Sequence, residues 1–151
     1  AVPASGGKAT RMPDAFSKNF AWSPDSKGFT VVSDGIISVA PVAGGKIQQI
    51  AKLKDLDLKS IFNLDWSPDG KHIACVGDHT EKGDAGPIFV IPAQGGKVTT
   101  LLTNDTTYKY GLHWSPDGKW ISYNSEGPVK IRPEGTMWEA DFEEILQKAS
   151  R

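Results

Sequence analysis

A hexapeptide that occurs three times constrains the fold of this chain more than any other feature. Its copies begin at Trp22, Trp66 and Trp114, 44 and 48 residues apart, and read Trp-Ser-Pro-Asp followed by Ser-Lys in the first copy and Gly-Lys in the others. Recurrence at about 40 to 50 residues is typical of repeat architectures, and several short strands within one period favour the blades of a β-propeller.

A second repeated element alternates with the first. Pro3, Pro41 and Pro92 each precede a Gly-Gly-Lys tripeptide, and a degraded copy follows Pro133. An apolar run, a proline and a glycine pair predict a hairpin turn that needs positive φ. One repeat then contains strand A ending in Trp, a Ser-Pro-Asp turn, strand B, a loop, strand C, a Gly-Gly turn and strand D. These four antiparallel strands would form one blade.

The sequence therefore predicts an all-β protein, a partial β-propeller of three four-stranded antiparallel blades with a leading partial blade and a short C-terminal helix. The predicted units are a partial blade over 1–12 (strands C and D), blades over 18–53, 62–103 and 110–138, and a helix over 139–149. Trp138, Phe142, Ile145 and Leu146 give the helical spacing, although a strand over 137–142 is the alternative. Because propellers close with about four to eight blades, we expect either a piece of a longer chain or a homodimer that completes a ring.

Composition excludes several classes of partner. The 17 basic and 18 acidic side chains leave a net charge of −1, so we expect no nucleic-acid partner. The longest apolar runs, such as 88–91, are far shorter than the roughly 20 residues that span a bilayer, so we expect no membrane insertion. Cys75 is the single cysteine, and its apolar neighbours indicate a buried strand residue rather than a nucleophile.

Sequence motifs for catalysis are absent. The chain has no Gly-x-Ser-x-Gly elbow, His-Glu-x-x-His pair, phosphate-binding glycine loop or Cys-x-x-Cys pair. Asp25, Asp69 and Asp117 each stand in a predicted turn, where the carboxylate would accept backbone hydrogen bonds. The three repeated Trp side chains would pack between blades. We therefore expect no enzyme activity, no cofactor and no metal.

The repeated hexapeptide, its apolar strand B and the Pro-x-x-Gly-Gly hairpin together resemble the WD-repeat-like propeller repeat of the TolB family. The resemblance covers nearly the whole chain, with Ser26 in place of the turn glycine and Glu134-Gly135 in place of the fourth glycine pair. It implies a propeller that binds proteins or small ligands, usually outside the bacterial cytoplasm, and hence a periplasmic or secreted protein. Similar blades also form accessory domains of tricorn-type and prolyl-oligopeptidase-type peptidases and the body of oligogalacturonate lyases.

Blade topology points to one end of the propeller as the binding face. The turns between strands A and B and between C and D share one end, and the more variable connections share the other, where binding tends to reside. The predicted variable loops span 11–19, 33–35, 52–63, 77–87, 103–111 and 124–128.

Candidate ligand-binding residues are mostly in these loops. They are the aromatic residues Phe16, Phe62, Tyr108 and Tyr110, the charged residues Lys18, Lys59 and Lys109, and His79 in the polar stretch 78–84. The aromatic rings could equally be tucked under their own loops. Asp65 and His113 occupy matched positions before Trp, so they would approach each other near the propeller axis, as a channel-lining pair or as a satisfied buried pair.

We therefore predict a non-catalytic propeller module that binds a protein, peptide or glycan through its variable-loop face. The alternative is an accessory or substrate-gating segment of a larger tricorn-like or prolyl-oligopeptidase-like peptidase or of a polysaccharide lyase.

Overall fold

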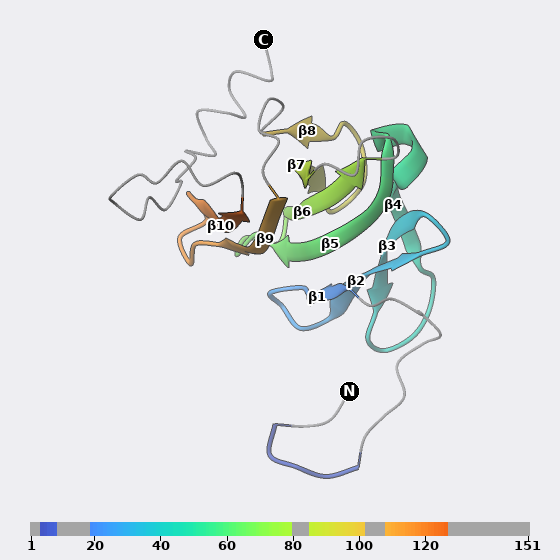
Figure 1. Ribbon diagram of the computed structural model, residues 1–151. Coiled ribbons are helices and arrows are strands. Elements are labelled where there is room, and N and C mark those ends of the chain that lie inside the picture. Colours follow the sequence, from blue (N-terminus) through green and yellow to red (C-terminus); the bar gives the residue numbers. More distant parts are fainter. Residues whose placement is uncertain (1–3, 9–18, 80–84, 102–107, 127–151) are drawn as a thin grey trace.

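The computed structural model describes residues 4–8, 19–79, 85–101 and 108–126 (Figure 1). Its elements are β1 (Phe20–Trp22), β2 (Gly28–Ser33), β3 (Ile36–Pro41), β4 (Gln48–Lys52), the 3₁₀ helix η1 (Leu53–Leu56), β5 (Leu58–Trp66), β6 (His72–His79), β7 (Ala85–Pro92), β8 (Thr99–Thr100), β9 (Tyr108–Trp114) and β10 (Ile121–Glu126).

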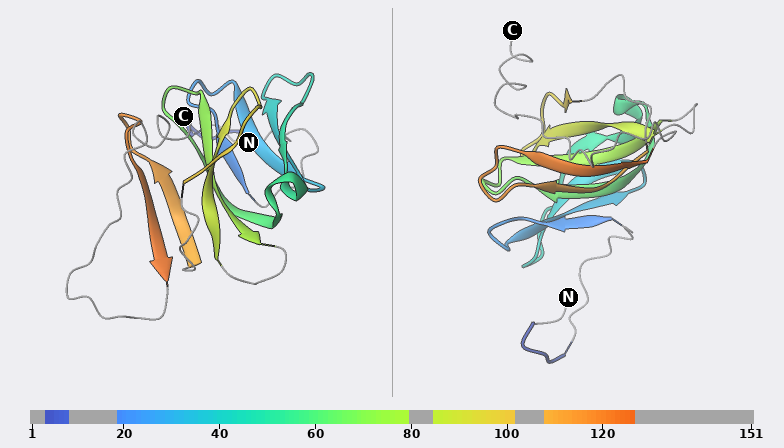
Figure 2. Two further views of the ribbon diagram at one scale, coloured as in Figure 1. Left: turned by 90° about the horizontal axis from the view of Figure 1, so that it is seen from above. Right: turned by 60° about the vertical axis from the view of Figure 1, so that its left-hand side comes forward.

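The strands form antiparallel sheets in the order that the repeats predict. One four-stranded sheet runs β1-β2-β3-β4, a second runs β5-β6-β7-β8, and β9 pairs with β10. The three sheets stack one after another in chain order (Figure 2). The predicted all-β partial propeller is therefore confirmed, while the helix predicted over 139–149 and strands C and D of the last blade lie outside the described residues.

The glycine-pair turns repeat with nearly identical backbones. Gly44 and Gly45 have φ of 80° and 120°, Gly95 and Gly96 have 82° and 121°, and Gly6 and Gly7 have 85° and 124°. The short described stretch 4–8 thus has the turn conformation predicted for the leading partial blade. The rest of that unit lies outside the described residues.

Each Ser-Pro-Asp turn is held together by its own side chains. The Ser67 hydroxyl donates to Asp69 Oδ1 at 2.6 Å, and the Lys71 backbone N–H donates to the same oxygen at 2.9 Å. The Ser67 oxygen accepts the His72 backbone N–H at 2.9 Å, which starts strand B. The turns at Asp25 and Asp117 repeat this pattern. The repeated aspartates are therefore turn acceptors, as predicted from the sequence.

These hydrogen bonds act on the ionisation of the turn carboxylates. The Ser23 hydroxyl and the Lys27 amide lower the pKa of Asp25, and the Ser115 hydroxyl and the Lys119 amide lower that of Asp117. At Asp69 burial opposes ionisation, but the bonds from Ser67 and Lys71 lower its pKa nevertheless. The carboxylates are stabilised as anions because their charged form accepts the bonds.

Two cores lie between neighbouring sheets. The first joins side chains of the first two blades, among them Ile37, Ile73 and Ile91, and the second joins β6 and β7 to β9 and β10. Cys75 is fully buried, and burial raises its thiol pKa to about 12. This confirms that Cys75 is a buried strand residue.

The repeated Trp side chains differ in burial. Trp114 is 8% exposed in the second core and Trp66 packs partly against the first core, as predicted. Trp22, however, is 44% exposed and meets Phe29 of its own blade at 5.9 Å between ring centroids. Trp66 and Trp114 each pack toward the blade before their own. For Trp22 that blade lies almost entirely outside the described residues, so its packing between blades stays a prediction.

Several predicted loops are strand instead. The range 52–63 contains η1 and the first half of β5, so Lys59 and Phe62 are strand residues, and Tyr108 and Tyr110 belong to β9. Both strands change register partway, between 61 and 63 in β5 and opposite 122–124 in β9. Such bulges break the two-residue alternation that reveals a strand in a sequence.

Candidate functional site

The inner strands of the second and third blades meet at Asp65 and His113. The His113 Nδ1 lies 3.6 Å from Asp65 Oδ2, so the predicted approach of this pair is correct. The same Oδ2 accepts the Trp114 backbone N–H at 2.8 Å, and Oδ1 accepts the Trp66 backbone N–H at 3.0 Å. The Asp65 side chain is 31% exposed and the His113 side chain 73%, so the pair is open to solvent rather than buried. Asp65 thus ties two blades together at a wet edge.

Asparagines three residues before Trp form further links that the sequence analysis missed. The Asn19 side chain donates to the Ile61 carbonyl of the second blade, and Asn63 Oδ1 accepts the Gly111 N–H of the third blade at 3.0 Å. The Trp66 indole N–H donates in the opposite direction, to the Ala21 carbonyl at 3.2 Å. The recurrence of Asn at one repeat position was the signal available in the sequence.

The predicted ligand-binding residues do not form one cluster. Lys59 lines a cleft of about 430 Å³ between the predicted variable loops 33–35 and 52–63, together with Asp34, Lys52 and Lys54. Tyr110 lies on the third blade and is 38% exposed. His79 is the last residue of β6 and Tyr108 the first of β9, at the same end of the sheets.

Other candidates lie in the interior or outside the described residues. Phe62 is half-buried and packs against the second core. Lys109 is fully buried, so it is not the surface charge that the sequence suggested. A bulge explains the difference, because it places Lys109 on the buried side and Tyr110 on the exposed side of the same strand. Phe16 and Lys18 lie outside the described residues.

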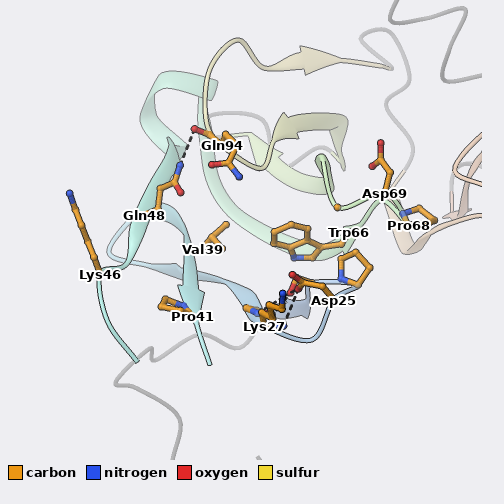
Figure 3. A pocket seen from close by; sticks show the side chains of 14 residues that line it. Asp25, Lys27, Val39, Pro41, Lys46, Gln48, Trp66, Pro68, Asp69 and Gln94 are labelled. Carbon is orange, nitrogen blue, oxygen red and sulfur yellow. Dashed lines mark hydrogen bonds between the residues drawn. The ribbon is translucent and has the colours of Figure 1, made fainter. Parts of the chain in front are cut away.

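A larger cleft opens at the opposite end of the sheets, between the first two blades. This turn-end cleft has a volume of about 650 Å³. Trp66 stands in its middle, with Pro68 and Asp25 on one side and Gln48 and Gln94 on the other (Figure 3). This is the end predicted to hold the turns between strands A and B and between C and D, away from the predicted binding face. The repeated Trp and Pro were predicted as packing and turn residues, and an opening between the blades at this end was not predicted.

The described residues offer little for catalysis or metal binding. No group of three or more His, Cys, Asp or Glu in the described ranges is placed to hold a metal ion. The turn aspartates already accept two hydrogen bonds on one oxygen each. Across these ranges, no helix has the length and apolar character needed to cross a membrane.

Comparisons with known proteins agree with the sheet order. The model of the family "WD domain, G-beta repeat" matches residues 52–80, which include η1, β5 and β6. No curated protein matches the chain by sequence.

Several solved structures share the fold. The putative TolB from Agrobacterium tumefaciens superposes with a TM-score of 0.57 at 26% identity, over 83% of this chain and 42% of that one. TolB from Acinetobacter baumannii gives 0.58 at 23% identity, over 84% and 30%. The tricorn protease gives 0.55 at 18% identity, over 89% and 14%. The chain thus spans less than half the length of each of these proteins.

Proposed function

Since the chain is a partial β-propeller with TolB-like, WD-repeat-like blades, we propose that it is a non-catalytic module that binds a protein or peptide. The likeness to the two TolB structures supports this proposal. It also supports a periplasmic or secreted location, which we propose on the same ground. The binding residues are proposed at the variable-loop end of the third blade, around Tyr110.

Exposure of Tyr110 on a paired strand carries the proposal. β9 is paired with β10 and packed against the second blade, so the ring is presented by a rigid support. A tyrosine with only two side-chain torsions loses little entropy on binding and offers both an apolar face and a hydroxyl. The exposed His113 imidazole lies three residues further along the same strand. Together they provide an aromatic and a polar contact without a catalytic arrangement.

A matched pair of substitutions tests the proposal. Phe62 and Tyr110 are 48 residues apart, at equivalent repeat positions, but only Phe62 packs against the core. Peptides selected from a displayed library on the immobilised chain would serve as probes. Tyr110→Ala should weaken their binding about tenfold or more while the melting temperature stays nearly constant. Phe62→Ala should instead lower the melting temperature.

Three results would contradict this function. The first is that the selected peptides bind Tyr110→Ala as tightly as the unmodified chain. The second is that Tyr110→Ala loses as much stability as Phe62→Ala. The third is that glycans from a panel bind through Tyr110 while no peptide does, which would assign the surface to carbohydrate.

A second candidate function is an accessory or substrate-gating segment of a larger enzyme. It is favoured by the tricorn protease likeness, in which nearly all of this chain superposes on a small part of a much longer one. The parent reading frame distinguishes the two functions, because a hydrolase or lyase domain on the same polypeptide would favour the accessory role.

A further inference from the structure

The turn-end cleft has the features of a peptide site on the face opposite to Tyr110. Trp66 forms its aromatic wall. Its indole N–H is already bonded to the Ala21 carbonyl at 3.2 Å, so the ring is fixed across the blade junction. At the next junction the equivalent ring, Trp114, is 8% exposed and closed to ligands. The first junction is thus more open than the next one.

Three prolines line the cleft together with Trp66. Pro24 and Pro68 come from the Ser-Pro-Asp turns of the two neighbouring blades, and Pro41 is the last residue of β3. Pro41 and Pro68 are labelled in Figure 3. All three have fixed φ, so this wall of the cleft loses little conformational freedom when a ligand binds. Aromatic-lined grooves accept extended polyproline II segments, which are themselves preformed and bind at low entropic cost.

Amide side chains supply the polar contacts. The Gln48 side-chain N–H donates to the Gln94 backbone carbonyl at 3.0 Å, which holds this amide in place across the two blades (Figure 3). Its carbonyl oxygen and second N–H suit a peptide backbone, which presents both a donor and an acceptor. The charged lining residues are two lysines and two aspartates, Lys27, Lys46, Asp25 and Asp69, so their formal charges cancel. A neutral ligand fits this balance better than a strongly charged one.

We infer that the turn-end cleft binds an extended, uncharged, proline-containing peptide segment, which stacks on Trp66 and receives a hydrogen bond from Gln48 or donates one to it. This site is separate from the surface around Tyr110, since the two lie at opposite ends of the sheets. It would allow one propeller to hold two polypeptide segments.

Decaproline is the probe, with an alternating Gly-Ser decapeptide as the ligand control. A titration of the full chain is followed by the indole ¹H–¹⁵N signals, and Trp66→Phe assigns the signal of Trp66. Decaproline should shift that signal, and the Gly-Ser peptide should not. Gln48→Ala should weaken decaproline binding about fivefold.

Gln49 provides the matched protein control. It is the neighbouring exposed residue on β4, it points to the opposite face of the strand, and it does not line the cleft. Gln49→Ala and Tyr110→Ala should therefore leave the decaproline affinity unchanged. Equal binding of the two peptides, an unmoved Trp66 signal, or equal losses from Gln48→Ala and Gln49→Ala would overturn the inference. Loss of decaproline binding in Tyr110→Ala would place the decaproline site at the Tyr110 surface and would overturn the inference as well.

Discussion

Asp65 is the residue whose removal best tests how the blades are joined. Its carboxylate accepts two backbone N–H groups, those of Trp66 and Trp114, and the second bond crosses from one blade to the next. Asp65→Ala removes both acceptors and the neighbour of His113. The local turn is left intact, because the Ser67–Asp69 hydrogen bonds do not involve this residue.

The expected loss of stability follows from the two bonds. A hydrogen bond to a charged group contributes about 1.5–3 kcal/mol, which gives about 3–6 kcal/mol for a dry pair. The Asp65 side chain is 31% exposed, so water can solvate the freed N–H groups and reduce the loss. We expect the free energy of unfolding to fall by about half of the dry value, about 1.5–3 kcal/mol. Asp65→Asn keeps one acceptor and should lose less than Asp65→Ala.

Urea unfolding followed by tryptophan fluorescence measures the free energy of unfolding, and amide hydrogen exchange reports on the Trp114 N–H. The control is Asp55→Ala, an exposed aspartate of η1, which should change stability by less than about 0.5 kcal/mol. If Asp65→Ala matched this control and the Trp114 amide exchanged no faster, the carboxylate would not be joining the blades.

Two further changes test the turns. Gly70 has φ of +72°, a left-handed conformation that is strained for a residue with a Cβ, so Gly70→Ala should cost about 1–2 kcal/mol in the same urea assay; no change would refute the strain. Burial lowers the pKa of His72 and outweighs the nearby Asp69, so the unfolded chain binds a proton at higher pH than the folded chain. The free energy of unfolding should therefore decline as pH falls below 6.5, the ordinary pKa of histidine. His72→Gln should flatten this pH dependence between about pH 8 and pH 5. If the substitution left it unchanged, the pH dependence would arise from other groups.

Local features were the most predictable part of this fold. The Ser-Pro-Asp turns and their carboxylate acceptors follow from short-range chemistry, since every partner lies within five residues. The repeat spacing also predicted one tertiary contact, between Asp65 and His113, because matched positions on inner strands of neighbouring blades are close. The predicted surface role of Lys109 failed, because the bulge in β9 reverses which side of the strand faces the core.

Burial was less predictable than the turns, because it depends on the neighbour across the blade junction. Trp22, Trp66 and Trp114 share the same local sequence, yet they are exposed, partly buried and buried respectively. The turn-end cleft was missed for the same reason. Its lining residues come from two blades that are joined by Trp66 and Gln48, and the width of that junction is not encoded in either repeat alone.

Equivalent positions in the blades distinguish structural substitutions from candidate binding residues. Lys109 stands at the position that Ile61 occupies in the previous blade, and its side chain is buried. Gly111 stands at the position of Asn63, and the Gly111 backbone N–H donates to Asn63 at the blade junction. Tyr110 replaces Phe62 and turns outward, so the exchange adds a hydroxyl to a ring that contributes less to the core. A substitution that exposes a large side chain on a paired strand gains no stability from packing, which is the physical reason for placing ligand contact at Tyr110.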